Sequence, residues 1–204
     1  MLQKFSKRQK VLVVVRLALL ITLTYGLYRV TAAGANHKFT GTIIDNPEPV
    51  DGVELVRAGG KTVAFPSAWH GKTLLVFFGY ANCPNVCPLT MAELAKIYRD
   101  LGEPEDLKVV MITVDPSRDT PKRIKQYAEG FHPNFVGLSG EPVAITKAAL
   151  AFYATSLAQA DGTVAHNSHV TLVDRQGQMR LVYNQDNVPK MAGDLQYILS
   201  RDRW

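Results

Sequence analysis

Length, composition and charge limit the classes to which this chain can belong. Its 204 residues suit one domain of ordinary size with a short additional segment, and 47% apolar and 20% charged residues exclude a disordered chain. The formal net charge is +5, but residues 1–35 hold six basic side chains and no acidic one, which leaves 17 basic and 18 acidic residues elsewhere. Because the rest of the chain lacks a basic excess, we expect no nucleic-acid partner.

The N-terminus combines a basic block with an apolar run. The basic residues are Lys4, Lys7, Arg8 and Lys10, and the run covers residues 11–30. Twenty helical residues at about 1.5 Å each just span a hydrocarbon layer of ~30 Å, and a basic flank stays on the cytoplasmic side. We therefore predict a single-pass anchor in the inner (cytoplasmic) membrane within residues 1–35, with a domain of residues 36–204 on the periplasmic side. The alternative is a signal peptide cleaved near residues 33–35.

The first half of the domain contains two kinds of predicted strand. Turn-rich residues 36–70 predict short strands at 43–44 and 53–56, paired as a hairpin. Continuous apolar runs at residues 73–78 and 107–114 are typical of strands buried on both faces. Between these two runs, Pro88 is predicted to begin a helix that reaches about residue 100.

The second half alternates helices and strands. Thr120 and Pro121 predict the cap and first residue of a helix. The further elements predicted are a helix over 142–156, strands over 170–174 and 179–183 joined as a hairpin, and a helix over 188–200. This order of elements predicts an α/β sandwich around a mixed central sheet, with ligands beyond the carboxyl ends of its strands.

Cys83 and Cys87 are the only cysteines, and they lie in the loop between a predicted buried strand and a predicted helix. Two cysteines are too few for a disulfide scaffold and indicate a single redox or metal site. With Pro88 as the first helical residue, Cys87 caps the helix, and we expect the helix dipole to favour its thiolate. Thiolates are soft ligands that suit Cu(I) and Zn(II). The spacing of three intervening residues favours metal binding over a redox pair, although a disulfide remains an alternative.

A histidine is the natural further ligand for such a site. Three of the five histidines, His37, His70 and His132, are expected at the surface. His166 and His169 directly precede the strand predicted at 170–174, whose start is expected to face the cysteine loop. The residues alone do not separate these two candidates.

Several segments, taken in order, resemble the Sco/SenC family of copper-binding assembly factors. They are Phe77-Phe78-Gly79-Tyr80, Cys83-Pro84-Asn85-Val86-Cys87-Pro88, the run from Thr113 to Pro121, Phe131-His132-Pro133 and Gly137-Leu138-Ser139-Gly140. The resemblance covers about residues 39–199. It implies a thioredoxin-like fold behind a single membrane anchor, with copper bound by Cys83, Cys87 and one histidine.

The resemblance also selects the histidine. In the family it stands eight residues before the aspartate of an Asp-x-x-Gly turn, which here is Asp174, so the implied ligand is His166. The family usually has an aspartate directly before this histidine, where this chain has Ala165; a carboxylate there can orient the imidazole. For residues 115–121 the resemblance implies partner contact or ordering of the site loop, and the alternative is a loop ion pair with a helix cap.

The function implied by the resemblance is a metallochaperone. It would bind Cu(I), with Cu(II) as a second state, and deliver copper to the dinuclear centre of cytochrome c oxidase subunit II or to another copper protein. One alternative is a thiol–disulfide oxidoreductase that uses Cys83 and Cys87 as its redox pair to reduce the partner's cysteines. Residues 164–171 lack the proline that such redox proteins place there, which favours metal binding. Another alternative is a copper or redox sensor, so enzymatic activity stays open.

Overall fold

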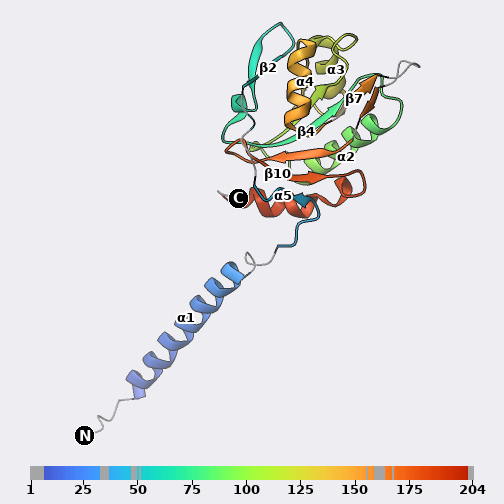
Figure 1. Cartoon of the computed structure of the whole chain (residues 1–204). Helices are drawn as coiled ribbons and strands as arrows, with labels where there is room; N and C mark the ends of the chain where they lie inside the picture. The colour runs from blue at the N-terminus through green and yellow to red at the C-terminus, as the bar shows by residue number, and fades with distance from the viewer. Residues whose placement is uncertain are drawn as a thin grey trace. The chain divides into compact units, whose positions relative to one another are not determined.

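The computed structural model of the chain is shown in Figure 1. It describes residues 7–32, 37–46, 50, 52–154, 156–158, 164–166 and 168–201. The chain divides into two compact units, residues 1–38 and residues 39–204. The first unit contains helix α1 (Lys7–Ala32). Among the described residues, no helix has the length and apolar character needed to cross a membrane, so the anchor predicted at residues 11–30 stays a prediction.

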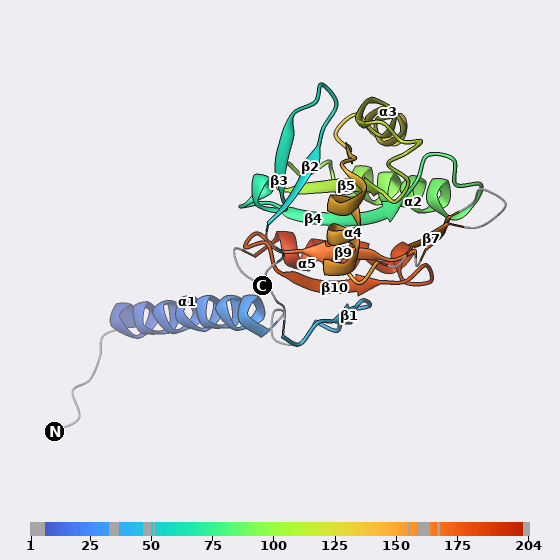
Figure 2. The same cartoon turned by 45° about the horizontal axis from the view of Figure 1, so that its top comes forward.

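A six-stranded mixed sheet forms the centre of the second unit. Its order is β1-β10-β9-β4-β5-β6, and Figure 2 shows β5, β4, β9, β10 and β1 side by side. The strands are β1 (Thr42–Ile43), β4 (Thr73–Gly79), β5 (Leu107–Thr113), β6 (Val136–Leu138), β9 (Val170–Val173) and β10 (Met179–Tyr183). Strands β4, β5 and β6 are parallel, whereas β9 is antiparallel to both β4 and β10. The predicted mixed α/β sheet is confirmed.

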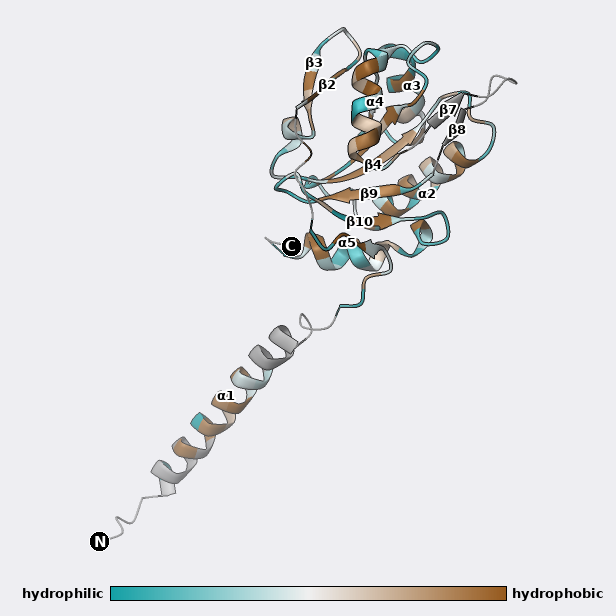
Figure 3. Cartoon of the chain, in the orientation of Figure 1, coloured by the Kyte–Doolittle hydropathy of each residue, from teal (hydrophilic) through white to brown (hydrophobic). Residues whose placement is uncertain are grey.

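Both faces of the sheet are covered, because β4 is apolar along its whole length. All seven of its residues are buried, and alternate side chains point to opposite faces. Leu75 and Phe77 pack with α2 (Val86–Asp100), α3 (Pro121–Phe131) and α5 (Ala192–Leu199). Leu74 and Val76 pack with α4 (Pro142–Ala151) and the hairpin of β2 (Val53–Val56) and β3 (Thr62–Phe65). Figure 3 shows the hydrophobic residues gathered along these central strands.

The hairpin predicted near the start of the domain is wrong in its pairing. Strand β1 pairs with β10 at the edge of the main sheet, and β2 pairs with β3, which the sequence did not predict. Gly59 and Gly60, both with positive φ, lie between β2 and β3. Val63 and Phe65 of β3 alternate with exposed neighbours and point into the core. Strand β2 therefore pairs with β3 across the nearby glycine turn, and not with the more distant apolar residues 43–44.

Two later boundaries also differ from the prediction. Helix α4 ends at Ala151 instead of residue 156, because Tyr153 adopts a positive φ of 54° and the chain turns. Beyond that turn lie two short strands that were not predicted, β7 (Ser156–Ala158) and β8 (Val164–His166), which pair with each other. The helix predicted from residue 188 begins as a short 3₁₀ helix (Val188–Lys190) and continues as α5.

A buried carboxylate fixes the start of the domain to its last helix. Asp194 of α5 is 1% exposed. Its Oδ2 accepts hydrogen bonds from the backbone N–H (2.9 Å) and hydroxyl (2.8 Å) of Thr40, and from the hydroxyl of Tyr183 (3.0 Å). Burial and this neighbouring carboxylate both raise the pKa of Tyr183, so its hydroxyl keeps the proton that it donates.

Candidate metal centre

The two cysteines lie at the carboxyl end of β4, one in the loop and one in the first turn of α2. Cys87 is fully buried and Cys83 is 9% exposed, and both carry reduced thiols. The backbone N–H of Cys87 donates a hydrogen bond to Sγ of Cys83 over 3.4 Å. The two residues therefore form one compact group, in which Cys83 lies nearer to solvent.

The start of α2 corrects two predictions about Cys87. The helix begins at Val86 with Asn85 as its cap, so Cys87 is the second helical residue and not the cap. Burial raises the pKa of the Cys87 thiol, and the hydrogen bond with Cys83 and the charge of Asp119 raise it further. The expected preference for the thiolate is thus wrong for the metal-free protein, because desolvation outweighs the helix dipole. A cation bound at the sulfur would reverse that balance, since a coordinating thiol loses its proton.

Gly79, the last residue of β4, makes room for the sulfur of Cys87. A Cβ atom at this position would lie 2.9 Å from Cys87 Sγ and 2.8 Å from Cε1 of Phe77. Both separations are shorter than real carbon contacts allow. The side chain of Cys87 therefore occupies its position only because residue 79 has no side chain.

Asp119 ties the cysteine loop to the segment that follows β5. This carboxylate is 1% exposed, and its Oδ2 accepts hydrogen bonds from the backbone N–H of Ala81 (2.9 Å) and the hydroxyl of Thr113 (2.8 Å). Arg123 lies beside it, with Nε 3.5 Å from Oδ1, and also donates from Nη2 to Asn82 Oδ1 over 2.6 Å. Both contacts to residues 81 and 82 restrain the loop that carries Cys83.

The same segment also contains the loop ion pair and helix cap considered from the sequence. Asp115 accepts hydrogen bonds from the hydroxyl of Ser117 (2.7 Å) and from Nε of Arg118. Oγ1 of Thr120 accepts from the backbone N–H of Arg123 over 3.3 Å and caps α3, as predicted. Residues 115–121 therefore do both things considered from the sequence: Asp119 orders the cysteine loop, and Asp115 and Thr120 form a local ion pair and a helix cap.

The start of β9 lies beside the end of β4. In the antiparallel register, Val170 is opposite Phe77, so residues just before β9 come near the cysteine loop. Nε2 of His169 donates to the backbone carbonyl of Phe152 over 3.1 Å, because a carbonyl oxygen can only accept. Burial lowers the pKa of His169 and keeps the ring neutral, which leaves Nδ1 as its acceptor atom.

His166 is placed by its backbone only. It ends β8 and is opposite Ser156 of β7, while its side chain lies outside the described part of the structure. Figures 1 and 2 show β7 at the end of the sheet toward which the arrow of β4 points. Within the described side chains, no group of three or more candidate metal ligands occurs. The ligand set Cys83, Cys87 and His166 therefore stays a prediction.

His132 differs from the surface position expected for it. Its side chain is 6% exposed and packs edge-to-face against Tyr98, with ring centroids 4.9 Å apart. Nδ1 accepts from the backbone N–H of Asn134 (3.2 Å), and Nε2 lies 3.3 Å from Oε1 of Glu103. His132 thus supports the loop after α3, whereas His70 is exposed as expected.

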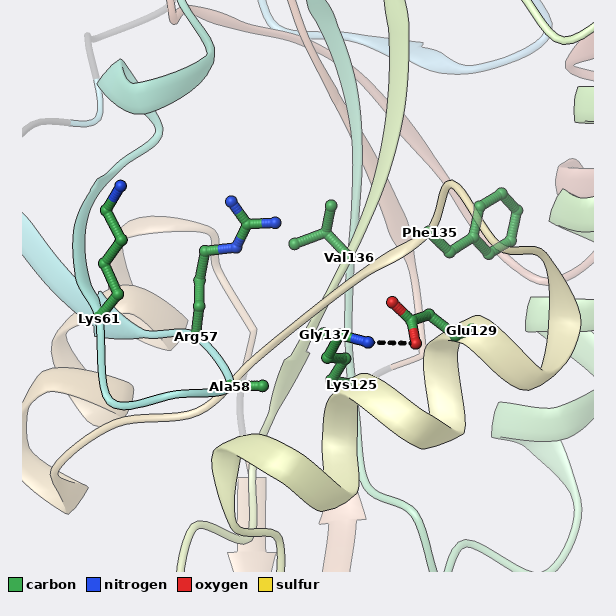
Figure 4. A pocket seen from close by; sticks show the side chains of 8 residues that line it. All are labelled: Arg57, Ala58, Lys61, Lys125, Glu129, Phe135, Val136 and Gly137. Atoms are coloured by element: carbon green, nitrogen blue, oxygen red, sulfur yellow. Dashed lines mark hydrogen bonds and ion pairs between the residues drawn. The ribbon is translucent and has the colours of Figure 1, made fainter.

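A separate cavity of about 210 Å³ lies between the β2–β3 hairpin, α3 and β6. Figure 4 shows Arg57 and Lys61 entering from the hairpin, with Lys125 paired to Glu129 on α3. Neither cysteine lines it, and neither does His169. This cavity could not be predicted from the sequence, because its walls come from three segments that are distant along the chain.

The SCO1/SenC family profile matches residues 50–200 of the chain. The chain belongs to the SCO1/SenC family. The solution structure of apo Sco1 from Thermus thermophilus is similar at a TM-score of 0.71 and 36% identity, covering 80% of this chain and 98% of that one. The structure of ScoI from Bradyrhizobium japonicum with copper bound is similar at a TM-score of 0.64 and 33% identity, covering 74% of this chain and 98% of that one. The predicted thioredoxin-like fold of the Sco proteins is confirmed.

A curated relative shows the same likeness at the level of sequence. A putative copper-binding protein from Stutzerimonas stutzeri is 31% identical over 125 residues, which are 58% of this chain and 59% of that protein. The match therefore spans about three fifths of that relative's length.

Proposed function

We propose that this SCO1/SenC protein is a copper chaperone. It holds one Cu(I) ion through Cys83, Cys87 and His166 and passes it to the dinuclear copper centre of cytochrome c oxidase subunit II, or to another copper protein. The observation that carries the proposal is the compact pair of reduced cysteines at the carboxyl end of β4, beside the start of β9. The copper-bound structure of a family member that is 33% identical supports the choice of metal.

The burial of the pair suits a soft monovalent ion. Burial raises the pKa of the Cys87 thiol, so without a bound metal this thiol keeps its proton. Cu(I) supplies the missing positive charge, and its binding releases thiol protons to solvent. Metal affinity should therefore rise with pH.

The unequal exposure of the two cysteines gives the handover a direction. Cys83 is 9% exposed and Cys87 is fully buried. An incoming ligand of the partner reaches the metal from the side of Cys83, so this thiolate is exchanged first and Cys87 releases the ion last. Stepwise ligand exchange of this kind avoids a bare copper ion in solution.

The experiment that tests the proposal is an anaerobic titration of the reduced, full-length protein with Cu(I) in competition with a chelator. We expect one-to-one binding, lost in Cys83→Ser and in Cys87→Ser and weakened strongly by His166→Ala. His70→Ala is the matched control, because this histidine is exposed and should leave the affinity unchanged. If His169→Ala alone weakens binding, the histidine assignment is wrong; if the wild type binds no Cu(I) tightly, the chaperone function is wrong.

A thiol–disulfide oxidoreductase is the second candidate, because the two cysteines are close enough for the backbone of one to bond the sulfur of the other. The attacking species in disulfide exchange is a thiolate, and the raised pKa of Cys87 disfavours it. Incubation of the reduced protein with a disulfide-bearing peptide from the partner separates the two functions. Turnover of this peptide would support the reductase, and its absence would leave copper delivery.

A copper or redox sensor differs from both in its cellular effect. Deletion of the protein should impair oxidase assembly at low copper if the protein delivers the metal. Normal assembly together with an altered response to copper or oxidants would instead support a sensor.

We further propose that the domain acts on the periplasmic side of the inner membrane. The basic block before residues 11–30 supports this orientation, because positive flanks stay in the cytoplasm. Fusion of a periplasm-dependent reporter after residue 204 should give activity. Retention of the full-length chain in carbonate-washed membranes would support an anchor, and release of a shortened chain would support a cleaved signal peptide.

A further inference from the structure

The cavity between the β2–β3 hairpin, α3 and β6 carries an excess of positive charge. Three basic side chains (Arg57, Lys61 and Lys125) and one acidic side chain (Glu129) line it, a net charge of +2. Lys125 and Glu129 form an ion pair with each other along α3. Among the described side chains, neither Arg57 nor Lys61 is paired with an acidic group, and the guanidinium of Arg57 lies 6.0 Å from the centroid of the Trp69 ring. Two cations at the cavity are therefore left without a counter-charge.

The alternation of side chains along the hairpin places these two cations on its inward face. The buried residues of this face are Val53, Leu55, Val63 and Phe65. Because every second residue of a strand points to the same side, Arg57 continues the series of β2 and Lys61 that of β3. Both side chains line the cavity, and Figure 4 shows them leaving the hairpin in the same direction.

Arg57 and Lys61 also lie opposite each other where the hairpin turns. The backbone N–H of Arg57 donates to the carbonyl of Lys61 over 2.9 Å, and the N–H of Gly60 donates to the carbonyl of Arg57 over 3.1 Å. Like charges at opposite positions of an antiparallel pair repel each other and destabilise the pair. An anion held between the two side chains would replace this repulsion by two attractions.

The walls of the cavity are fixed by contacts within the domain. The backbones of Val56 and Ser139 exchange two hydrogen bonds, of 2.7 and 3.0 Å, which join the hairpin to the end of β6. On the other side, β6 runs so close to α3 that a Cβ atom at Gly137 would lie 2.3 Å from the carbonyl oxygen of Ile124. A ligand would therefore enter a cavity whose backbone is already in place, which lowers the entropic cost of binding.

Charge and size together select the class of anion. The volume of about 210 Å³ is smaller than the roughly 300–1,000 Å³ of pockets for drug-sized ligands. Two cations match a dianion, whereas a single carboxylate would neutralise only one of them. A phosphate group carries a charge of about −1.5 to −2 at pH 7. Its oxygens can accept two parallel hydrogen bonds from a guanidinium such as that of Arg57 and a further bond from an ammonium such as that of Lys61.

We propose that this cavity is a binding site for a phosphate group, which Arg57 and Lys61 hold from the hairpin. The group is either inorganic phosphate or the phosphate of a small monoester. Neither cysteine lines the cavity, so the site does not depend on the proposed copper binding.

Calorimetric titration of the full-length, reduced, metal-free protein in neutral detergent tests the proposal. Inorganic phosphate and glycerol phosphate are titrated separately, in chloride buffer of constant ionic strength. We expect saturable one-to-one binding that is about tenfold weaker in Arg57→Gln and in Lys61→Gln, the effect of losing a hydrogen bond to a charged acceptor. Binding should be abolished in the double variant. Lys122→Gln is the matched control and should bind normally, because Lys122 is exposed on α3 and does not line the cavity.

The amide resonances of two glycines locate the bound anion. Gly137 lines the cavity, so its amide signal should shift during the phosphate titration. Gly177, in the turn between β9 and β10, lies outside the cavity lining and should not shift. The shift of Gly137 should disappear in the double variant.

The two ligands distinguish the source of the phosphate group. Binding of inorganic phosphate alone would support a site for the free ion, and tighter binding of glycerol phosphate would support a site for a monoester. Absence of saturable binding of both ligands by the wild type would overturn the inference. Equal weakening in Lys122→Gln and Arg57→Gln would overturn it too, because the effect would then come from general surface charge. A shift of Gly177 without a shift of Gly137 would place the anion elsewhere and would also overturn it.

Discussion

The two sides of the candidate copper site are built in different ways. The cysteine arm, residues 79–88, is embedded in the domain: Gly79 ends a fully buried strand, Asp119 holds Ala81, and Cys87 lies in the first turn of α2. The histidine arm, β8 with its last residue His166, belongs to a separate two-stranded sheet with β7. Among the described residues, side-chain contacts from distant segments hold the cysteine arm, and backbone pairing with β7 places the histidine arm.

This difference indicates that the two arms should contribute unequally to copper binding. A preorganised pair of ligands binds metal without the loss of entropy that ordering the chain would cause. The cysteine arm should therefore provide most of the affinity for copper. The histidine arm should complete the coordination and present the metal to a partner. Changes to the supports of the cysteine arm should therefore have larger effects than equally conservative changes near the histidine arm.

The strongest test of the comparison removes the support of the cysteine arm at Asp119. In Asp119→Ala the N–H of Ala81 and the hydroxyl of Thr113 lose their buried acceptor. We expect the free energy of unfolding to fall by about 3 kcal/mol, as typical for leaving two buried donors unpaired. Cu(I) affinity should fall by about 10–100-fold, the usual effect of losing a residue that supports a metal ligand. Urea unfolding and chelator competition measure the two effects.

Asp100→Ala is the control for removal of a carboxylate. Asp100 forms only an exposed pair with Lys96, so stability should change by less than about 0.5 kcal/mol. An Asp119→Ala protein that unfolds with a normal free energy and binds Cu(I) normally would show that the cysteine arm does not depend on its tie to Asp119.

A smaller effect is expected when space is removed beside Cys87. The methyl group of Gly79→Ala would meet Cys87 Sγ and Phe77, and we expect a loss of about 1–3 kcal/mol in stability together with weaker Cu(I) binding. Gly130→Ala is the matched control, because a Cβ atom at that helical position meets no atom within 4 Å. It should stabilise α3 by about 0.5–1 kcal/mol. Equal stability changes in the two variants would contradict the close packing around Cys87.

The smallest effect concerns His169, beside the histidine arm. Because burial lowers its pKa in the folded state, the unfolded chain takes up a proton first as the pH falls. The contribution of His169 to the free energy of unfolding is complete above about pH 6.5, the ordinary pKa of histidine. It is lost as the pH falls from there toward the lowered pKa of His169 in the folded protein. Unfolding of His169→Gln between about pH 7 and pH 5 should show a shallower decline than unfolding of the wild type. Identical slopes would mean that His169 is as accessible to protons folded as unfolded.

The central sheet was predictable because its strands are marked locally. The runs at 73–78 and 107–114 and the pair at 170–174 and 179–183 match β4, β5, β9 and β10 within one residue. A strand that is apolar along its whole length must be buried on both faces, so it lies in the middle of a sheet that is covered on both sides. The location of the cysteines at the end of β4 follows directly from these strands.

The chemistry of the site was less predictable, because it depends on contacts between distant residues. The bond from Asp119 to Ala81 joins positions 38 residues apart. The thiolate expected at Cys87 was a local inference from the helix start, and burial by the surrounding core outweighed it.

Asp194 has a mechanical consequence for a protein that is attached to something through its N-terminus. Tension entering the domain from residue 38 is met first by the three hydrogen bonds between Asp194, Thr40 and Tyr183, and then by the pairing of β1 with β10. Two further strands, β10 and β9, stand between that edge and β4. If the N-terminal segment is anchored as predicted, a force applied through it would act first on this edge of the sheet, and the cysteine pair follows β4, three strands further in.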